Sequence, residues 1–177
     1  MTQIYALTDN GSITLQVKLH EVSEKCDRVE LKHNLIETMN HYQGIGLSAN
    51  QCGVMERVFV MYEDFRKREI VACFNPNIII SSTDTVLMDE GCLTYPGLWL
   101  KVSRPETVQV VFEDEFGETQ KRKYSGLEAR VFQHEMDHME GTDFTQKVSK
   151  LKLDLAKKRR NKQLKKSEQY REFRQLT

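Results

Sequence analysis

The segment QHEMDHMEG, residues 133–141, carries two histidines four residues apart, with a glutamate directly after the first. In a helix, residues four apart lie on the same face, so His134 and His138 can both point toward one metal ion. Glu135 lies one step around the helix and can reach a water molecule at that ion without binding the ion itself. In H-E-x-x-H metallohydrolases, two imidazoles hold the metal and the glutamate acts as the base. On its own, the pattern is also compatible with a surface helix that carries two solvated histidines.

A catalytic metal site of this kind needs a third protein ligand. No histidine follows His138, and the downstream carboxylates Glu168 and Glu172 both lie in a strongly basic region. Cys92, in the segment EGCLTYPG, is the best upstream candidate, because the glycine and proline residues around it favour a short, exposed loop. The alternative interpretation of Cys92 is a buried and unreactive thiol.

The amino-acid composition narrows the possible classes of protein. The 177-residue chain is 39% hydrophobic and 29% charged, which is typical of a single globular domain. No run approaches the ~18 apolar residues of a membrane span, and the N-terminus lacks the features of a signal peptide. The four cysteines form no C-x-x-C pair, so we expect free thiols in a reducing cytoplasm. We therefore expect a cytoplasmic protein of a bacterium or of a virus-infected bacterial cell, with an organelle as the alternative.

Charge is distributed unevenly along the chain, although its formal net charge is zero. Residues 147–177 contain 12 Lys/Arg and 3 Asp/Glu, a net charge of +9, so residues 1–146 carry a net charge of −9. The basic region contains neither glycine nor proline, which permits a helix. We expect residues 1–146 to form a single catalytic domain and residues 147–177 to form a basic helical tail of the same domain.

The hydrophobic pattern predicts the secondary structure. It predicts a helix over about residues 24–42, a second helix from Ser125 or Gly126 to about Glu140, and a third helix in the tail. Runs rich in β-formers predict short strands at 57–62, 70–74, 77–80, 85–88, 99–102 and 107–112, and a hairpin leading into 119–124. This order is typical of an α+β fold. We expect short antiparallel or mixed strands around a central helix that carries H-E-x-x-H, with a C-terminal helix.

Three separated blocks carry a resemblance to a known family. They are GIGLSANQ (44–51), EGCLTYPG (90–97) and QHEMDHMEG (133–141). Together they resemble peptide deformylase, the enzyme that removes the formyl group from the N-terminal formylmethionine of nascent chains. Each block alone is a weak signal, whereas the three in this order are specific. The resemblance implies metal-dependent hydrolysis of N-formylmethionyl peptides with release of formate.

The resemblance also implies the metal ligands and the base. Cys92, His134 and His138 are the ligands, with water in the fourth position, and Glu135 passes a proton to the leaving amine. The family implies Fe²⁺ as the physiological ion. A Cys-His-His set should bind Zn²⁺ more tightly than Fe²⁺, so purified protein can carry Zn²⁺ or Ni²⁺ instead.

Two further groups of residues follow from the resemblance. The side-chain amide of Gln51 and the backbone N–H of Leu93 are the donors for the developing oxyanion. Ser48 stands where the family usually has Ala, and Thr94 where Ser is usual. We expect neither of these departures to touch the chemistry.

The substrate is expected to lie along the glycine-rich segments. The resemblance assigns pairing with the peptide backbone to the Gly44–Gly46 loop and to Gly91, where the absence of a side chain allows close approach. The methionine side chain then needs an apolar pocket. The residues expected to line it are Leu127, Val131 and His134, which share one helix face, together with Ile45 of the Gly44–Gly46 loop.

Two other functions are compatible with parts of the sequence. An H-E-x-x-H metallopeptidase acting on unblocked peptides would take its third ligand from a downstream carboxylate. An RNA-binding protein with a basic helical tail and incidental histidines would hold no stoichiometric metal. For the deformylase interpretation, we expect a monomer without membrane contact whose basic tail binds ribosomal RNA.

Overall fold

The computed structural model describes residues 2–175, and the side chains of residues 2–166. In chain order the elements are η1 (Ile13–Leu15), α1 (Arg28–His41), β1 (Gly46–Ser48), η2 (Ala49–Cys52), β2 (Val58–Asp64), β3 (Glu69–Ser81), β4 (Thr85–Glu90), β5 (Leu100–Pro105), β6 (Thr107–Glu113), β7 (Thr119–Ser125), α2 (Gly126–Met139), η3 (Phe144–Lys147) and α3 (Lys150–Gln175), where η denotes a 3-10 helix. The predicted α+β class is confirmed. Every strand pair in the described residues is antiparallel.

The strands form two separate sheets. Five of them make one sheet in the order β1-β2-β3-β6-β7, while β4 and β5 form a two-stranded ribbon. The prediction of two strands at 70–74 and 77–80 is wrong, because β3 runs continuously through both. Asn75 adopts a left-handed conformation with φ of 48°, and the pairing with β6 shifts register between Phe74 and Asn77. Asn75 and Pro76 therefore form an irregularity within the strand and not its end.

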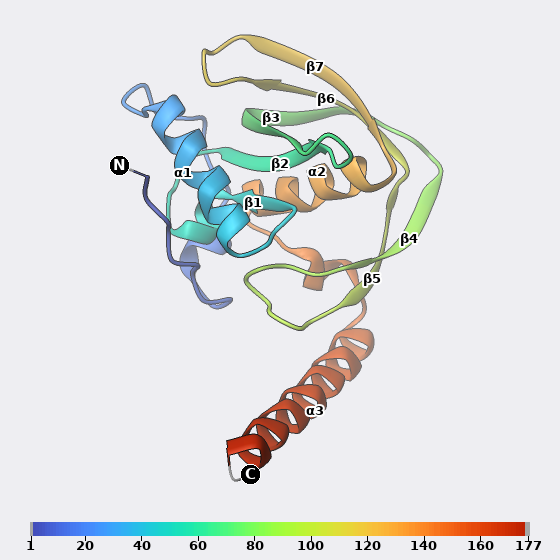
Figure 1. Ribbon diagram of the computed structural model, residues 1–177. Coiled ribbons are helices and arrows are strands. Elements are labelled where there is room, and N and C mark those ends of the chain that lie inside the picture. Colours follow the sequence, from blue (N-terminus) through green and yellow to red (C-terminus); the bar gives the residue numbers. More distant parts are fainter. Residues whose placement is uncertain (1, 176–177) are drawn as a thin grey trace.

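The first helix begins later than the sequence predicts. The backbone N–H of Glu30 donates to the side chain of Asp27 at 2.9 Å, so Asp27 caps the helix and α1 starts at Arg28. Its buried residues, including Leu35 and Met39, pack with Val58 and Val60 of β2. Helix α1 thus covers one edge of the five-stranded sheet (Figure 1).

Helix α2 lies between the five-stranded sheet and the β4–β5 ribbon (Figure 1). All residues from Ala129 to Met139 are buried. A helix covered on all sides can carry ionisable side chains only where they find partners within the protein. The polar residues of α2 must therefore be paired with residues of the surrounding elements.

The C-terminal turn of α2 is fixed by the N-terminal part of the chain. The Leu19 N–H donates to the Met139 carbonyl at 2.9 Å, and the Asn50 side-chain amide donates to the His138 carbonyl at 2.8 Å. Gly141 follows with φ of 70° and packs against the backbone of residues 16–18. These contacts hold the helix turn that carries His138.

The first turns of helix α3 attach it to the body. Leu153 and Ala156 pack against an apolar cluster that includes Leu100 and Phe144. Arg160 Nε donates to the Pro96 carbonyl at 2.8 Å. Beyond these contacts the helix projects away from the body (Figure 1). No described helix is long and apolar enough to cross a membrane.

The close approach at Gly141 gives a first prediction. A Cβ at this position would lie 2.6 Å from the Val17 carbonyl carbon and 2.8 Å from the Lys18 nitrogen, in a backbone conformation that disfavours any side chain. We expect Gly141→Ala to lower the free energy of unfolding by roughly 2–4 kcal/mol, from the left-handed conformation and the overpacking together. Urea unfolding measures this loss.

Gly126 provides the matched control. It also has a positive φ, of 59°, but a Cβ there meets nothing within 4 Å. Gly126→Ala should therefore cost only the conformational part, about 1–2 kcal/mol. Equal losses in the two variants would contradict the steric argument for Gly141.

Candidate metal centre

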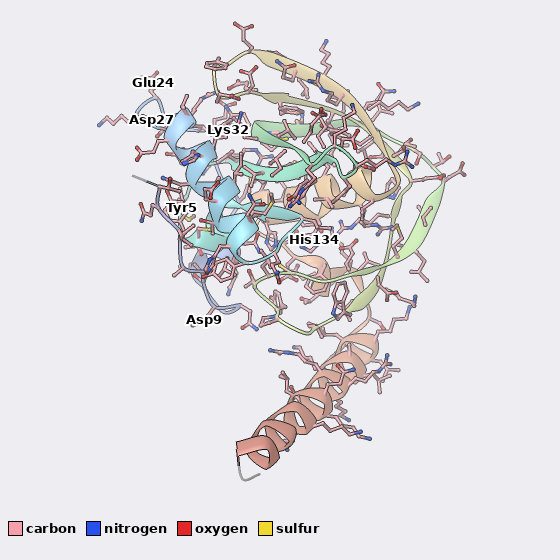
Figure 2. All side chains as sticks on the ribbon, viewed as in Figure 1. Tyr5, Asp9, Glu24, Asp27, Lys32 and His134 are labelled. Carbon is pink, nitrogen blue, oxygen red and sulfur yellow. The ribbon has the colours of Figure 1, made fainter. Side chains whose placement is uncertain are left out.

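Three side chains that can bind a metal converge between α2 and the ribbon. Cys92, in the loop after β4, lies beside His134 and His138 of α2, and one ligand atom from each lies within 4.8 Å of the others. Cys92 Sγ and His138 Nε2 are 3.4 Å apart. In the part of the chain that the structure describes, no other three His, Cys, Asp or Glu residues form such a group. Figure 2 places His134 in the interior of the body.

The donor set fits a four-coordinate ion. One thiolate and two imidazoles leave one position for water or substrate, as in other catalytic sites. His134 Nδ1 lies 3.0 Å from Glu90 Oε2, which leaves Nε2 of this ring for the ion. Glu135 Oε2 is buried and has no hydrogen-bond partner among the described residues. A carboxylate oxygen in that state fits a neighbouring site that receives water.

The charges of the cluster favour metal binding and proton transfer. Burial alone would raise the pKa of the Cys92 thiol, but His138 and hydrogen bonds from both histidines outweigh it and lower the pKa to about 5. The thiol is then ionised at neutral pH, the form that binds metals. Burial raises the pKa of Glu135 to about 7, against the attraction of the two histidines. A carboxyl group with this pKa both accepts and releases protons near neutral pH.

Glu90 is the centre of a buried ion-pair network. Its Oε1 accepts hydrogen bonds from Arg104 Nε at 2.6 Å and from Arg130 Nη1 at 2.8 Å. Its Oε2 accepts from Arg104 Nη2 at 2.8 Å and lies 3.0 Å from His134 Nδ1. Burial alone would raise the pKa of Glu90, but Arg104 and His134 hold it well below its usual range. Glu90 is therefore an anion that orients His134.

The sequence analysis did not select Glu90, Arg104 or Arg130. The only signal for Glu90 is its place two residues before Cys92, since a carboxylate often orients a ligating histidine. The two arginines lie 14 and 40 residues from Glu90 in sequence, and no pattern in the chain connects them.

The side chain of Gln51 is held by four hydrogen bonds. Its Nε2 donates to Cys92 Sγ at 3.2 Å and to Thr94 Oγ1 at 2.9 Å. Its Oε1 accepts from both the backbone N–H and the hydroxyl of Ser48, each at 3.0 Å. The expectation that Ser48 and Thr94 do not touch the chemistry stays a prediction, but both residues contact Gln51. Both fix the orientation of the Gln51 amide beside Cys92.

A pocket of about 370 Å³ opens beside the three candidate ligands. The residues selected from the sequence that line it are Gly44, Ile45, Gly46, Gln51, Gly91, Cys92, Leu93, Leu127, Val131, His134 and Glu135. His138 is fully buried and does not line the pocket. The lining residues that the sequence analysis missed include Tyr95, Trp99 and Arg130.

Two glycines shape this pocket because they have no side chain. A Cβ at Gly46 would lie 2.5 Å from Glu135 Oε1, and a Cβ at Gly91 would lie 3.2 Å from the ring of Trp99. Either side chain would displace a pocket wall or the candidate base. The glycines therefore leave room for Glu135 and for the Trp99 ring.

A buried H-E-x-x-H helix beside an open pocket is the arrangement of a metal-dependent hydrolase. Comparison with known proteins narrows this class. The family model of polypeptide deformylase matches residues 1–154. This chain therefore belongs to the polypeptide deformylase family.

Individual relatives agree with this assignment. Peptide deformylase 1 of Burkholderia multivorans is 41% identical over 140 residues, which cover 76% of this chain and 77% of the relative. A peptide deformylase of Thermotoga petrophila is 34% identical over 157 residues, covering 88% and 94%. The crystal structure of a Legionella pneumophila peptide deformylase has a TM-score of 0.83 at 31% identity, covering 93% and 98%. That of a Synechococcus elongatus peptide deformylase in complex with actinonin has a TM-score of 0.82 at 32% identity, covering 91% and 90%.

The Glu90 network gives a second prediction. Glu90→Gln keeps the size of the side chain but removes the anion shared by Arg104 and Arg130. Breaking a buried ion pair on one side typically costs about 3–5 kcal/mol. We expect a loss of that size in the free energy of unfolding, measured by urea titration.

Asp89, the neighbouring residue on β4, is the control. Its side chain is 58% exposed and pairs with Lys101 on the surface at 3.1 Å. Asp89→Asn should change the free energy of unfolding by less than about 1 kcal/mol. If the two variants were equally stable, Glu90 would not be the electrostatic centre described above.

Proposed function

We propose that this enzyme removes the formyl group of N-formylmethionyl peptides at the site formed by Cys92, His134, His138 and Glu135. The observation that carries the proposal is the convergence of an upstream cysteine with the histidine pair of α2. The relatives named above are peptide deformylases, and this supports formylated nascent peptides as the substrate. The reaction is hydrolysis of the formamide bond, with formate and a free N-terminal methionine as the products.

Cys92, His134 and His138 would hold one divalent ion. We infer Fe²⁺ as the physiological ion from the family resemblance, whereas Zn²⁺ or Ni²⁺ can replace it in purified protein because they bind such ligands more tightly. When bound, the ion supplies a Lewis acid that makes water acidic enough to react at neutral pH.

The protein side chains would supply the remaining chemistry. Glu135 takes the proton of the attacking water and delivers it to the leaving amine nitrogen, and a pKa near neutrality suits both steps. The Gln51 amide and the Leu93 N–H donate hydrogen bonds to the formyl oxygen as it gains negative charge. The formyl oxygen would take over one of the two donors that Gln51 Nε2 now directs at Cys92 and Thr94.

The pocket would orient the substrate. The backbone of the peptide pairs with the Gly44–Gly46 segment on one side and with Gly91 on the other. The methionine side chain lies against Leu127 and Val131, with Ile45 at the entrance. All of these residues line the same pocket as Glu135, and this supports the assignment.

A metallopeptidase acting on unblocked peptides is the less favoured alternative. It requires a downstream carboxylate as the third ligand, and the side chains of its candidates, Glu168 and Glu172, lie outside the described residues. Family membership and the position of Cys92 beside the histidines both favour the deformylase.

The basic tail is the part that we propose to bind the ribosome. Residues 1–146 would form the catalytic domain and residues 147–177 the tail. Between residues 157 and 166 the tail carries seven Lys or Arg residues and no acidic residue. Leu153 and Ala156 attach its base to the body, and Arg160 donates to the Pro96 carbonyl. The other six basic side chains of this segment are exposed and would be available to the phosphates of ribosomal RNA. We also propose that the enzyme is a monomer and works in a bacterial-type cytoplasm, where translation starts with formylmethionine.

A third prediction separates metal binding from proton transfer. Cys92→Ala removes a ligand, so it should lose both the metal and formate release from a formyl-Met peptide. Glu135→Gln should keep the metal and the fold but lose most of the turnover, because nothing takes the proton of water. Metal analysis of both purified variants, with a formate assay, makes the test. Full metal content in Cys92→Ala would favour the metallopeptidase, whereas metal loss in folded Glu135→Gln would contradict its role as a base.

A fourth prediction concerns the tail. Truncation after Ala156 keeps the contacts of Leu153 and Ala156 with the body but removes the whole basic segment of residues 157–166 and the residues that follow. The truncated enzyme should hydrolyse a short formyl-Met peptide at nearly the full rate and bind ribosomes more weakly. Binding of the full-length enzyme should fall steeply between about 50 and 200 mM salt, because released counterions drive it. Equal ribosome co-sedimentation of both proteins at low salt would assign the tail another purpose.

A further inference from the structure

The ribbon that carries Cys92 is not part of the main sheet. Strands β4 and β5 pair only with each other in the described residues, and Cys92 follows two residues after the end of β4 at Glu90. A two-stranded ribbon has little stability of its own. The position of Cys92 relative to His134 and His138 therefore depends on the contacts between the ribbon and α2.

One arginine of α2 contacts both strands of the ribbon. Arg130 Nη1 donates to the Val102 carbonyl of β5 at 2.8 Å, and Nη2 donates to the Val86 carbonyl of β4 at 2.5 Å. Nη1 also donates to Glu90 Oε1 at 2.8 Å. Arg130 is only 5% exposed, so water competes little for these bonds. A single planar guanidinium thus ties both strands and the end of β4 to the helix of the histidines.

A second arginine lies on the ribbon and contacts α2. Arg104 of β5 pairs with Asp137 of α2 at 2.9 Å and donates to the Gln133 carbonyl at 3.4 Å. Arg104 holds the β5 side of the ribbon, whereas Arg130 also reaches β4, the strand that leads directly into Cys92. Losing Arg130 would therefore loosen β4 while Arg104 still pairs with Glu90.

We propose that Arg130 is a positioning residue that sets the distance between Cys92 and the histidine pair, and thereby the affinity of the site for its divalent ion. This inference rests on the ligand set of the proposed function. Metal–ligand distances tolerate changes of only about 0.2 Å, so a small movement of the ribbon weakens binding. The loss of a hydrogen bond to Glu90 also relaxes the carboxylate that orients His134.

Arg130→Met tests this role because methionine keeps an unbranched apolar stem but has no donors. We expect the affinity for Zn²⁺, measured by competition with a chromophoric chelator, to fall by about tenfold or more, the range found when groups that orient metal ligands are changed. With Co²⁺ in place of Zn²⁺, the thiolate-to-cobalt absorption band should shift or weaken. Arg130→Lys keeps the charge but lacks the fork that spans both strands, so its affinity should lie between those of Arg130→Met and the unaltered enzyme.

Arg57 offers a matched control on the other side of α2. Its guanidinium also donates to three carbonyls, those of Leu19, Pro76 and Met139, and pairs with Glu140 at 2.7 Å. Arg57→Met should lower the unfolding midpoint, as Arg130→Met does. It should leave the Zn²⁺ affinity and the Co²⁺ spectrum unchanged, because the Leu19 N–H and the Asn50 amide still hold the helix turn that carries His138. A purely structural role for Arg130 predicts that both variants behave alike.

The outcomes separate this inference from the proposed function. Unchanged Zn²⁺ affinity in Arg130→Met, or an equal loss in Arg57→Met, would overturn the inference while Cys92→Ala still loses its metal. Should Arg130→Met not fold, Arg130→Lys decides, and an affinity equal to that of the unaltered enzyme overturns the inference. Full affinity in Cys92→Ala would overturn the ligand set and this inference together.

Discussion

The buried carboxylate of Glu90 is the constraint on which the site depends. Burying an anion costs several kcal/mol unless cations and hydrogen bonds compensate for it. Here the compensation comes from Arg104 of β5 and Arg130 and His134 of α2, so one charge draws together a helix and a ribbon that no shared sheet connects. The arrangement also decides which nitrogen of His134 faces the centre. The same contacts of Glu90 therefore determine both the charge pairing and the geometry of the metal site.

The candidate metal centre lies between a rigid helix, α2, and a pocket wall made largely of loops. Helix α2 is buried along most of its length, and its last turn is held by Leu19 and Asn50, so the histidine pair has little freedom. The opposite wall includes the glycine-rich segment at the start of β1 and the loop after β4, and Gly46 of the first segment comes close to the candidate base. Glu135 and the two histidines thus stay fixed on a helix, whereas Cys92 and Leu93 lie in the loop after β4.

Much of the fold could be predicted from the sequence, because its signals are local. Helix α2 follows from its hydrophobic period, and most strands follow from β-rich runs between turns. Strand β1 was missed because three residues are too few for a pattern, and β3 was divided because Asn75-Pro76 usually ends a strand. The residues of the candidate site were harder to predict from the sequence. The histidine pair has a helical spacing, whereas Cys92 stood out only as the best upstream candidate, and the family resemblance then implied that it is a ligand. The Glu90 network and the contact of Thr94 with Gln51 join residues far apart in sequence, which only the folded chain brings together. The contact of Ser48 with Gln51 is local, because the two residues are three apart and form a capping box.

Helix α3 is joined to the body without a flexible linker. Only Val148 and Ser149 separate it from η3, and Arg160 fastens it to Pro96 at the rim of the pocket. Its 26 residues correspond to a rod about 39 Å long. Because this rod is rigid and fixed to the body at one end, its axis keeps a constant angle to the body. A surface that binds its far end would therefore also fix the orientation of the pocket opening relative to that surface.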